Sequence, residues 1–141
     1  LDAFSKATTL SGNVHEAWNY KGYVFEEIGK HQEALDAYDK AIQIKPDFVI
    51  AFNNKGLLQD TMGNHLEAIE TYNKALTIKP DLDIAWFNKA CAEALLSNKE
   101  GALSSLKKAI ELNQSFKRIA RTNPDFLKIK DDPDFINVVG N

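Results

Sequence analysis

Apolar and polar positions recur along this chain with the spacing of amphipathic helices, and the pattern repeats every 34 residues. The segments LDAYDKAIQIKPDF (35–48) and IETYNKALTIKPDL (69–82) align without a gap at that shift. The segments that precede them align at the same shift, and a third copy follows. The sequence therefore predicts three equivalent units, which cover residues 15–48, 49–82 and 83–116.

Each unit is predicted to hold two helices with one buried stripe. In the first half a bulky aromatic residue is followed, one helical turn later, by a small residue that lets another helix come close. In the second half a small, a bulky and a small residue stand at helical spacing. These sets are Trp18–Gly22, Phe52–Gly56 and Trp86–Ala90, then Ala34–Tyr38–Ala41, Ala68–Tyr72–Ala75 and Ala102–Leu106–Ala109.

Residues with turn and helix-ending chemistry separate these helices. Glycine, or a Ser-Asn pair, suits the C-cap of the first helix, and proline cannot continue the second. The residues are Gly29, Gly63, Ser97 with Asn98, Pro46 and Pro80. One such helical hairpin cannot cover its own apolar surface, so we expect the units to stack on one another.

The unit resembles the tetratricopeptide repeat, whose signature has an aromatic residue, Gly, Ala, a second aromatic, Ala and Pro at these positions. The resemblance extends from residue 1 to about residue 116. It implies an all-α fold: a right-handed superhelical solenoid of helix-turn-helix repeats. The sequence departs from the family at Lys21, Lys55 and Lys89, where Leu is favoured, at Gln59 and Glu93, where an aromatic is usual, and at Gln114, in place of Pro.

The two ends of the chain fall outside the three units. Residues 1–14 align with 35–48, so we expect them to form the second helix of a truncated preceding repeat. Such a helix exposes an apolar stripe, and we expect it to dock on the next unit and to promote self-association. Residues 117–141 are predicted to form C-terminal capping helices, with Phe126 and Phe135 in their apolar faces and prolines at first helical positions.

Charge and composition exclude several classes of partner. The net charge of the 141 residues is −3, and acidic and basic residues are interleaved, which argues against nucleic acid and anionic membranes. No apolar run approaches the roughly 20 residues of a membrane helix, so no membrane insertion is expected. The only cysteine, Cys91, has no disulfide partner, which favours a reducing compartment and a cytoplasmic location.

No group of residues has the spacing of a catalytic or metal site. His31 and His65 occupy equivalent places near the turn between the two helices, where packing is the expected role. Cys91 has no His or Asp placed by a motif to activate it, so we expect a small groove or core residue. No phosphate-binding loop is present. We therefore expect no enzyme activity, no metal and no cofactor in this segment.

The resemblance implies that the first helix of each unit lines a concave, peptide-binding face. Asn54 and Asn88 share a position where family members often use Asn to grip the backbone of a ligand, since a carboxamide both donates and accepts. The alternative is that these amides bridge neighbouring repeats. The candidate peptide-binding residues are Asn19, Tyr20, Tyr23, Asn53, Asn54, Leu57, Ile84, Phe87, Asn88 and Leu95.

The candidate face also indicates what kind of peptide it would take. Repeats that hold the C-terminal carboxylate of heat-shock chaperones use Lys, Asn, Lys and Arg, and here only Asn54 matches. The other three positions hold Asn19, Ile84 and Asn88. Because Glu26, Glu27 and Asp60 belong to the implied face, a peptide with Lys or Arg beside apolar residues fits better.

Three functional hypotheses follow from the sequence. The first is a non-catalytic protein–protein interaction scaffold that binds an extended or helical peptide in its concave groove. The second is a structural self-assembly module within a longer repeat array. The third is a regulatory segment of a larger enzyme. Replacing Asn54 and Asn88 by Ala separates the first two, because peptide capture should fall while the oligomer size stays unchanged.

Overall fold

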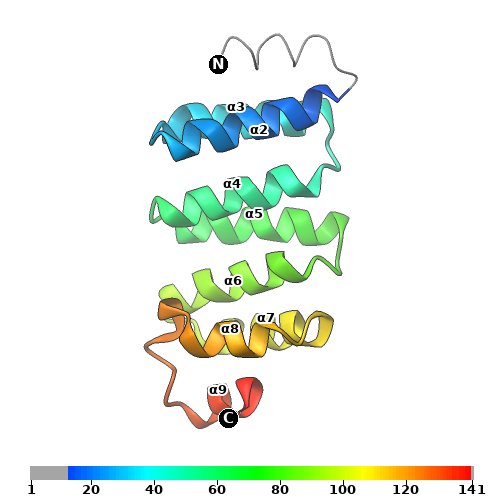
Figure 1. Ribbon diagram of the computed structural model, residues 1–141. Helices are drawn as coiled ribbons and strands as arrows, with labels where there is room; N and C mark the ends of the chain where they lie inside the picture. The colour runs from blue at the N-terminus through cyan, green and yellow to red at the C-terminus, as the bar shows by residue number, and fades with distance from the viewer. Residues whose placement is uncertain (1–12, 141) are drawn as a thin grey trace.

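The computed structural model describes residues 13–140, and every regular element within them is helical. The helices are stacked in successive hairpins along one column (Figure 1). None of the helices in this range is long and apolar enough to cross a membrane. The elements are α2 (Val14–Glu27), α3 (His31–Ile44), α4 (Val49–Thr61), α5 (His65–Ile78), α6 (Asp83–Leu95), α7 (Lys99–Leu112), α8 (Phe116–Thr122), the 3-10 helix η1 (Pro124–Phe126) and α9 (Pro133–Val139).

The expected helix over residues 1–14 lies almost entirely outside the described residues. Asn13 precedes α2 and Val14 opens it, one residue before the predicted start of the first unit. The pairs α2–α3, α4–α5 and α6–α7 are the three predicted hairpins. An all-α solenoid of helical hairpins is therefore the fold of this chain.

The small residue of each first helix lets the second helix come close, as predicted. A Cβ added at Gly22 would lie 2.6 Å from Cε1 of Tyr38, and one added at Gly56 would lie 2.6 Å from Cε1 of Tyr72. Both tyrosines are fully buried. In the third unit Ala90 takes the place of glycine, and Leu106 takes the place of the bulkier ring.

The turns between paired helices have the predicted geometry. Gly29 and Gly63 have φ angles of 79° and 86°, in the left-handed region that glycine adopts without strain. Ser97, at the equivalent place in the third unit, also has a positive φ, of 61°. The three turns therefore share one backbone conformation, although only two of them have the residue that best suits it.

Stacking of one unit on the next covers the apolar stripes. Leu58 of α4 packs on Ala34 and Tyr38 of the first unit. Ala92 of α6 packs in the same way on Ala68 and Tyr72 of the second unit. Each second helix is thus covered by the first helix of the following unit, which is the arrangement of a solenoid.

The C-terminal segment closes the third unit. The Phe116 ring stacks on Phe87, with ring centroids 4.6 Å apart, and Phe126 packs against Phe87 and Phe135. Pro124 and Pro133 stand at the starts of η1 and α9. The segment after Pro124 forms one 3-10 turn, followed by further turns, where the sequence predicted a capping helix.

Candidate functional site

The first helices of the three units, α2, α4 and α6, adjoin along one face of the stack, which we call the A-helix surface. Two side-chain hydrogen bonds connect these helices. The Nδ2 atom of Asn54 donates to Oδ1 of Asn19 at 3.1 Å, and Nδ2 of Asn88 donates to Oδ1 of Asn53 at 3.2 Å. The four amides therefore form a ladder that fixes the position of each unit relative to the next.

The ladder confirms that these asparagines bridge neighbouring repeats. The ladder leaves each of these amides with further donors and acceptors, because a carboxamide has two donor hydrogens and two acceptor lone pairs. In each pair one amide uses one donor hydrogen and the other uses one lone pair. All four residues are half-buried. Their predicted contact with the backbone of a peptide stays a prediction.

Several apolar side chains on the A-helix surface are exposed to solvent. Tyr20 and Tyr23 of α2 are 52% and 50% exposed, and their rings lie 6.2 Å apart. Leu57 of α4 is 42% exposed. Ile84 and Leu95 of α6 are exposed to a smaller extent. Five of the candidate peptide-binding residues therefore present apolar area to solvent.

Phe87 is a correction to the predicted set. Only 5% of its surface is exposed, because Phe116 stacks on its ring at an interplanar angle of 14° and Phe126 packs against its edge. Residues that follow the third unit therefore cover the side chain that the family's pattern would offer to a ligand. Phe87 is a core residue in this structure.

The acidic residues of the A-helix surface have different partners in successive units. Glu26 accepts a hydrogen bond from the Tyr38 hydroxyl at 2.8 Å. Burial, and then this contact with Glu26, raise the pKa of Tyr38 far above its usual range. Asp60, the equivalent of Glu26, instead contacts Nδ1 of His65. Tyr72 is the equivalent of Tyr38 in the second unit. Its hydroxyl is buried and has no hydrogen-bond partner among the described residues.

Two buried polar pairs were not predicted from the sequence. The Thr71 hydroxyl donates to Oε1 of Gln59 at 2.6 Å, and the Ser105 hydroxyl donates to Oε1 of Glu93 at 2.6 Å. In the first unit the same positions hold Phe25 and an alanine. The signal was available: each departure from the aromatic is matched, twelve residues later, by a hydroxyl in place of alanine.

The lysines that replace the family's leucine lie over aromatic rings or against an acid. The Nζ atom of Lys21 is 4.5 Å from the Trp18 ring, and that of Lys89 is 5.2 Å from the Trp86 ring. These cation–π contacts let the lysine stem cover apolar surface while its charge stays in water. Lys55 instead pairs with Asp39 of the preceding unit, at 2.7 Å.

Candidate chemical groups in the described residues are held in packed, unreactive forms. Cys91 is buried, and burial, followed by the charges of Asp125 and Asp60, raises the pKa of its thiol well above the usual range. Burial therefore favours the protonated form of the thiol. Within residues 13–140 no three His, Cys, Asp or Glu side chains are grouped so that they could hold a metal ion.

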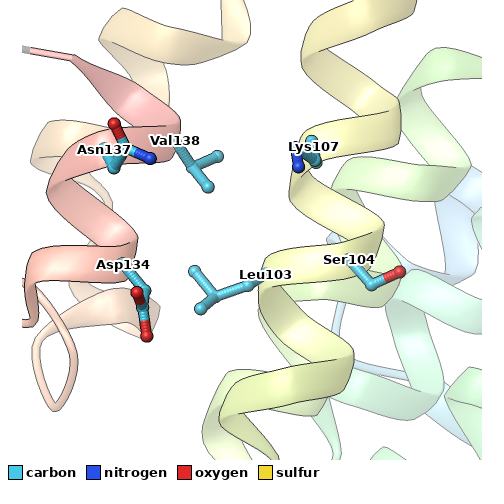
Figure 2. Close-up of a pocket in the computed structure, with 6 residues that line it drawn as sticks. All are labelled: Leu103, Ser104, Lys107, Asp134, Asn137 and Val138. Atoms are coloured by element: carbon cyan, nitrogen blue, oxygen red, sulfur yellow. The ribbon is translucent and has the colours of Figure 1, made fainter.

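A cleft of about 330 Å³ separates α7 from α9 (Figure 2). Leu103 and Val138 point towards each other across it (Figure 2). The polar residues that line it, Ser104, Lys107, Asp134 and Asn137, are all exposed to solvent. The cleft therefore offers water-screened groups to a ligand rather than a buried polar contact.

Comparisons with known proteins bear on this geometry. Models described as tetratricopeptide repeat match residues 15–48, 49–82 and 84–116. The chain belongs to the tetratricopeptide repeat (TPR) family. The Trp18, Phe52 and Trp86 side chains lie at equivalent places in the three TPR units, as the sequence predicted, and they are half-buried rather than fully buried.

Several solved structures have the same fold as this chain. The chain is 29% identical to MamA, with a TM-score of 0.73, and the alignment covers 83% of this chain and 68% of that one. It is similar in fold to the first TPR of Spaghetti (RPAP3) bound to the HSP90 peptide SRMEEVD, with 19% identity, a TM-score of 0.70 and coverage of 83% and 87%. It is also similar in fold to the Sgt2 TPR domain from Aspergillus fumigatus. The identity is 21%, the TM-score is 0.72, and the alignment covers 83% of this chain and 81% of that one. A search of curated proteins gives no match.

Proposed function

We propose that this TPR chain is a non-catalytic protein-interaction scaffold that binds an extended or helical peptide across the A-helix surface. The family is generally a protein-interaction repeat, and one solved structure of the same fold is described as bound to a peptide. The observation that carries the proposal is the row of exposed apolar residues beside the asparagine ladder. Tyr20, Tyr23 and Leu57 supply apolar area, and the ladder amides supply donors and acceptors for a peptide backbone.

The chemistry of the surface favours a peptide with Lys or Arg beside apolar residues. Glu16 and Glu27 are exposed on the same helix as the tyrosine pair. A partner with basic residues would gain electrostatic complementarity there, which chiefly sets specificity and the association rate. An acidic C-terminal peptide is disfavoured, since Ile84 and Asn88 stand where carboxylate-binding repeats have Lys and Arg.

Affinity for such a peptide would come mainly from the aromatic side chains. A neutral hydrogen bond to a ladder amide contributes only about 0.5–1.5 kcal/mol net. Buried aromatic anchors dominate interface energies, and truncating one costs about 2 kcal/mol or more. Tyr20 and Tyr23 are about half exposed, so replacing them leaves the fold largely intact. They are better test positions than Asn54 and Asn88, whose hydrogen bonds join the units.

Selection from a random peptide library displayed on phage tests the proposal. We expect the wild-type chain to enrich sequences with basic and apolar residues, and the Tyr20→Ala/Tyr23→Ala variant to lose these binders. Ile44→Ala/Ile78→Ala is the matched control, because these isoleucines are also exposed but lie on α3 and α5. Binders that tolerate the tyrosine variant and are lost with the control would place recognition elsewhere and reject the proposal.

Self-assembly is the second candidate function. Ile28, Met62 and Leu96 are exposed and equivalent, each at the C-cap of a first helix. A row of this kind along one edge could pair with a second copy. Light scattering distinguishes the two functions: assembly through this row predicts a mass that falls when the three residues are replaced by Gln, with peptide capture unchanged. We also propose, from the sequence alone, a cytoplasmic location, and we keep a role as a regulatory segment of a larger enzyme as a further hypothesis.

A further inference from the structure

The segment 123–127 turns back onto α6 after α8 ends. Phe126 is fully buried, and its ring lies 6.0 Å from that of Phe87, centroid to centroid. The Nδ2 atom of Asn123 lies 3.9 Å from Sγ of Cys91. Phe87 is a residue of α6 that the sequence assigned to the peptide-binding face, and Cys91 is one that it assigned to the groove or the core. The chain's own C-terminal segment therefore occupies the place that a ligand would take on the third unit.

Apart from the phenylalanine ring, the Asn123 contact with Cys91 and a hydrogen bond between the Asp125 and Cys91 side chains, the contacts of this segment are local or exposed. Its regular structure is a single 3-10 turn, in which Asn123 Oδ1 accepts from the Asp125 backbone N–H at 2.8 Å. Leu127, the next residue, is 61% exposed. At the edge of the stack Lys128 Nζ donates to the Ser97 hydroxyl at 3.2 Å, and this contact is exposed to solvent. Exposed pairs of this kind contribute little to stability.

One charge works against closure of the segment. Asp125 is partly buried against α4, α5 and α6, where it faces Asp60, His65 and Cys91. Burial, and then the charge of Asp60, raise the pKa of the Asp125 carboxyl, while Cys91 and His65 act in the opposite sense. The closed position is thus stabilised by the Phe126 ring and by the hydrogen bond between Asp125 and Cys91, and it is opposed by burial of the Asp125 carboxylate near Asp60.

We propose that residues 123–127 are a plug that closes the α6 part of the A-helix surface and opens without unfolding the hairpins. A partner peptide meets α2 and α4 directly and has to displace the plug to reach Phe87 and Cys91. The role of the plug in partner binding rests on the proposed function. Its opening does not, because the opening can be measured on the free protein.

The rate at which a maleimide modifies Cys91 measures the opening. Cys91 is the only cysteine, and it lies beneath Asn123, so modification reports exposure of this one position. For the wild-type chain we expect a rate that is nearly independent of urea at low concentrations, as for a local opening. A rate that rises with urea along the slope of global unfolding would overturn the proposal, since the plug would then open only when the domain unfolds.

Variants of the plug give the second readout. Phe126→Ala removes the buried ring and should raise the modification rate about tenfold or more, while circular dichroism shows the helices retained. Phe126→Leu is the milder form, to be used if the alanine variant does not fold. Leu127→Ala is the matched control, because its side chain is exposed, and should leave the rate unchanged.

A folded Phe126 variant with the wild-type rate, or a Leu127→Ala variant that reacts as fast as Phe126→Ala, would reject the plug. Loss of the plug and loss of the proposed function are distinguishable. If peptide selection fails while Cys91 still becomes reactive in the Phe126 variant, the function is wrong and the plug stands. If selection succeeds and the modification rate follows global unfolding, the plug alone is wrong.

Discussion

The hydroxyl of Tyr38 donates a hydrogen bond to Oε2 of Glu26 at 2.8 Å, across the two helices of the first repeat. In the second repeat the acceptor position holds Asp60, whose side chain is one methylene shorter and which contacts His65 instead. Tyr72 is left with a buried hydroxyl that has no hydrogen-bond partner within residues 13–140. Two repeats with the same backbone thus contain different polar networks, and the difference follows from the length of one side chain.

This contrast predicts different costs for the same substitution. Tyr38→Phe removes the donor and leaves the partly buried Glu26 carboxylate without it, so the free energy of unfolding should fall by about 1–2 kcal/mol. Tyr72→Phe removes a hydroxyl that is already unpaired, and should be neutral or slightly stabilising. Urea denaturation of the two variants measures both values. Equal losses at the two positions would contradict the assignment of partners.

The close approach of Gly56 to Tyr72 makes a second prediction. A glycine-to-alanine change inside an exposed helix stabilises it, but here the new Cβ would lie 2.6 Å from the tyrosine ring. We expect Gly56→Ala to lower the free energy of unfolding by about 1–3 kcal/mol. The double variant Gly56→Ala/Tyr72→Leu recreates the Ala90–Leu106 pair of the third repeat and should lose less than the sum of its two single changes.

A double-mutant cycle followed by urea denaturation gives the coupling between these positions. Additive losses would mean that the ring and the glycine do not constrain each other. A stabilised Gly56→Ala variant would show that the two helices can separate at no cost.

The turn after α6 offers a stabilising substitution. Ser97 has a φ of 61°, whereas the same turn in the other repeats uses Gly29 and Gly63. Ser97→Gly should raise the free energy of unfolding by about 1 kcal/mol, because glycine adopts this conformation without strain. Gly63→Ala should lower it by a similar amount, and since no atom lies within 4 Å of its added Cβ, that loss reports backbone strain alone. Thermal denaturation with opposite shifts for the two variants checks this; shifts of the same sign would be inconsistent with it.

The raised pKa of Asp125 predicts a dependence on pH. The folded chain keeps a proton on this carboxyl at pH values where the unfolded chain, with an ordinary value of 3.8, has lost it. Stability therefore falls as the pH rises through the folded-state pKa. Asp125→Asn removes this titration but keeps Asp60, His65 and Cys91. The melting temperature of the variant minus that of wild type should be smallest at pH 3 and grow towards pH 7.

A difference that stayed constant between these pH values, or that shrank as the pH rose, would contradict the burial of Asp125. The contact of Lys99 lowers the pKa of Asp132 and acts in the opposite direction. It is present in both proteins and cancels in the comparison.

The repeat architecture could be predicted because its determinants are local and periodic. The spacing of Gly22 and Tyr38, and of their counterparts, encodes contacts within one hairpin that recur every 34 residues. Glycine at the turns encodes a backbone conformation that few other residues adopt. Three copies of each signal support one another, which a single copy of a short motif could not do.

The candidate surface could be predicted only in part, because it depends on contacts between repeats and with the cap. Tyr20, Tyr23 and Leu57 are exposed as the periodicity indicates. Phe87 has the same position in its repeat as Asn53, but the chain after α7 covers it, and no periodic signal describes a segment that occurs once. Whether Asp60 contacts Tyr72 or His65 likewise depends on the length of its side chain, and the spacing of residues along the sequence does not specify that contact.

We propose above all that exposed side chains of α2 and α4 bind a peptide with basic and apolar residues. Fluorescence anisotropy with two labelled peptide pools, one of Lys, Arg, Leu and Phe and the other of Asp, Glu, Leu and Phe, tests it most directly. We predict that the basic pool binds more tightly and that Tyr20→Ala/Tyr23→Ala weakens its binding about tenfold or more, while Ile44→Ala/Ile78→Ala leaves it unchanged. Tighter binding of the acidic pool, or binding that the tyrosine variant does not weaken, would contradict the claim.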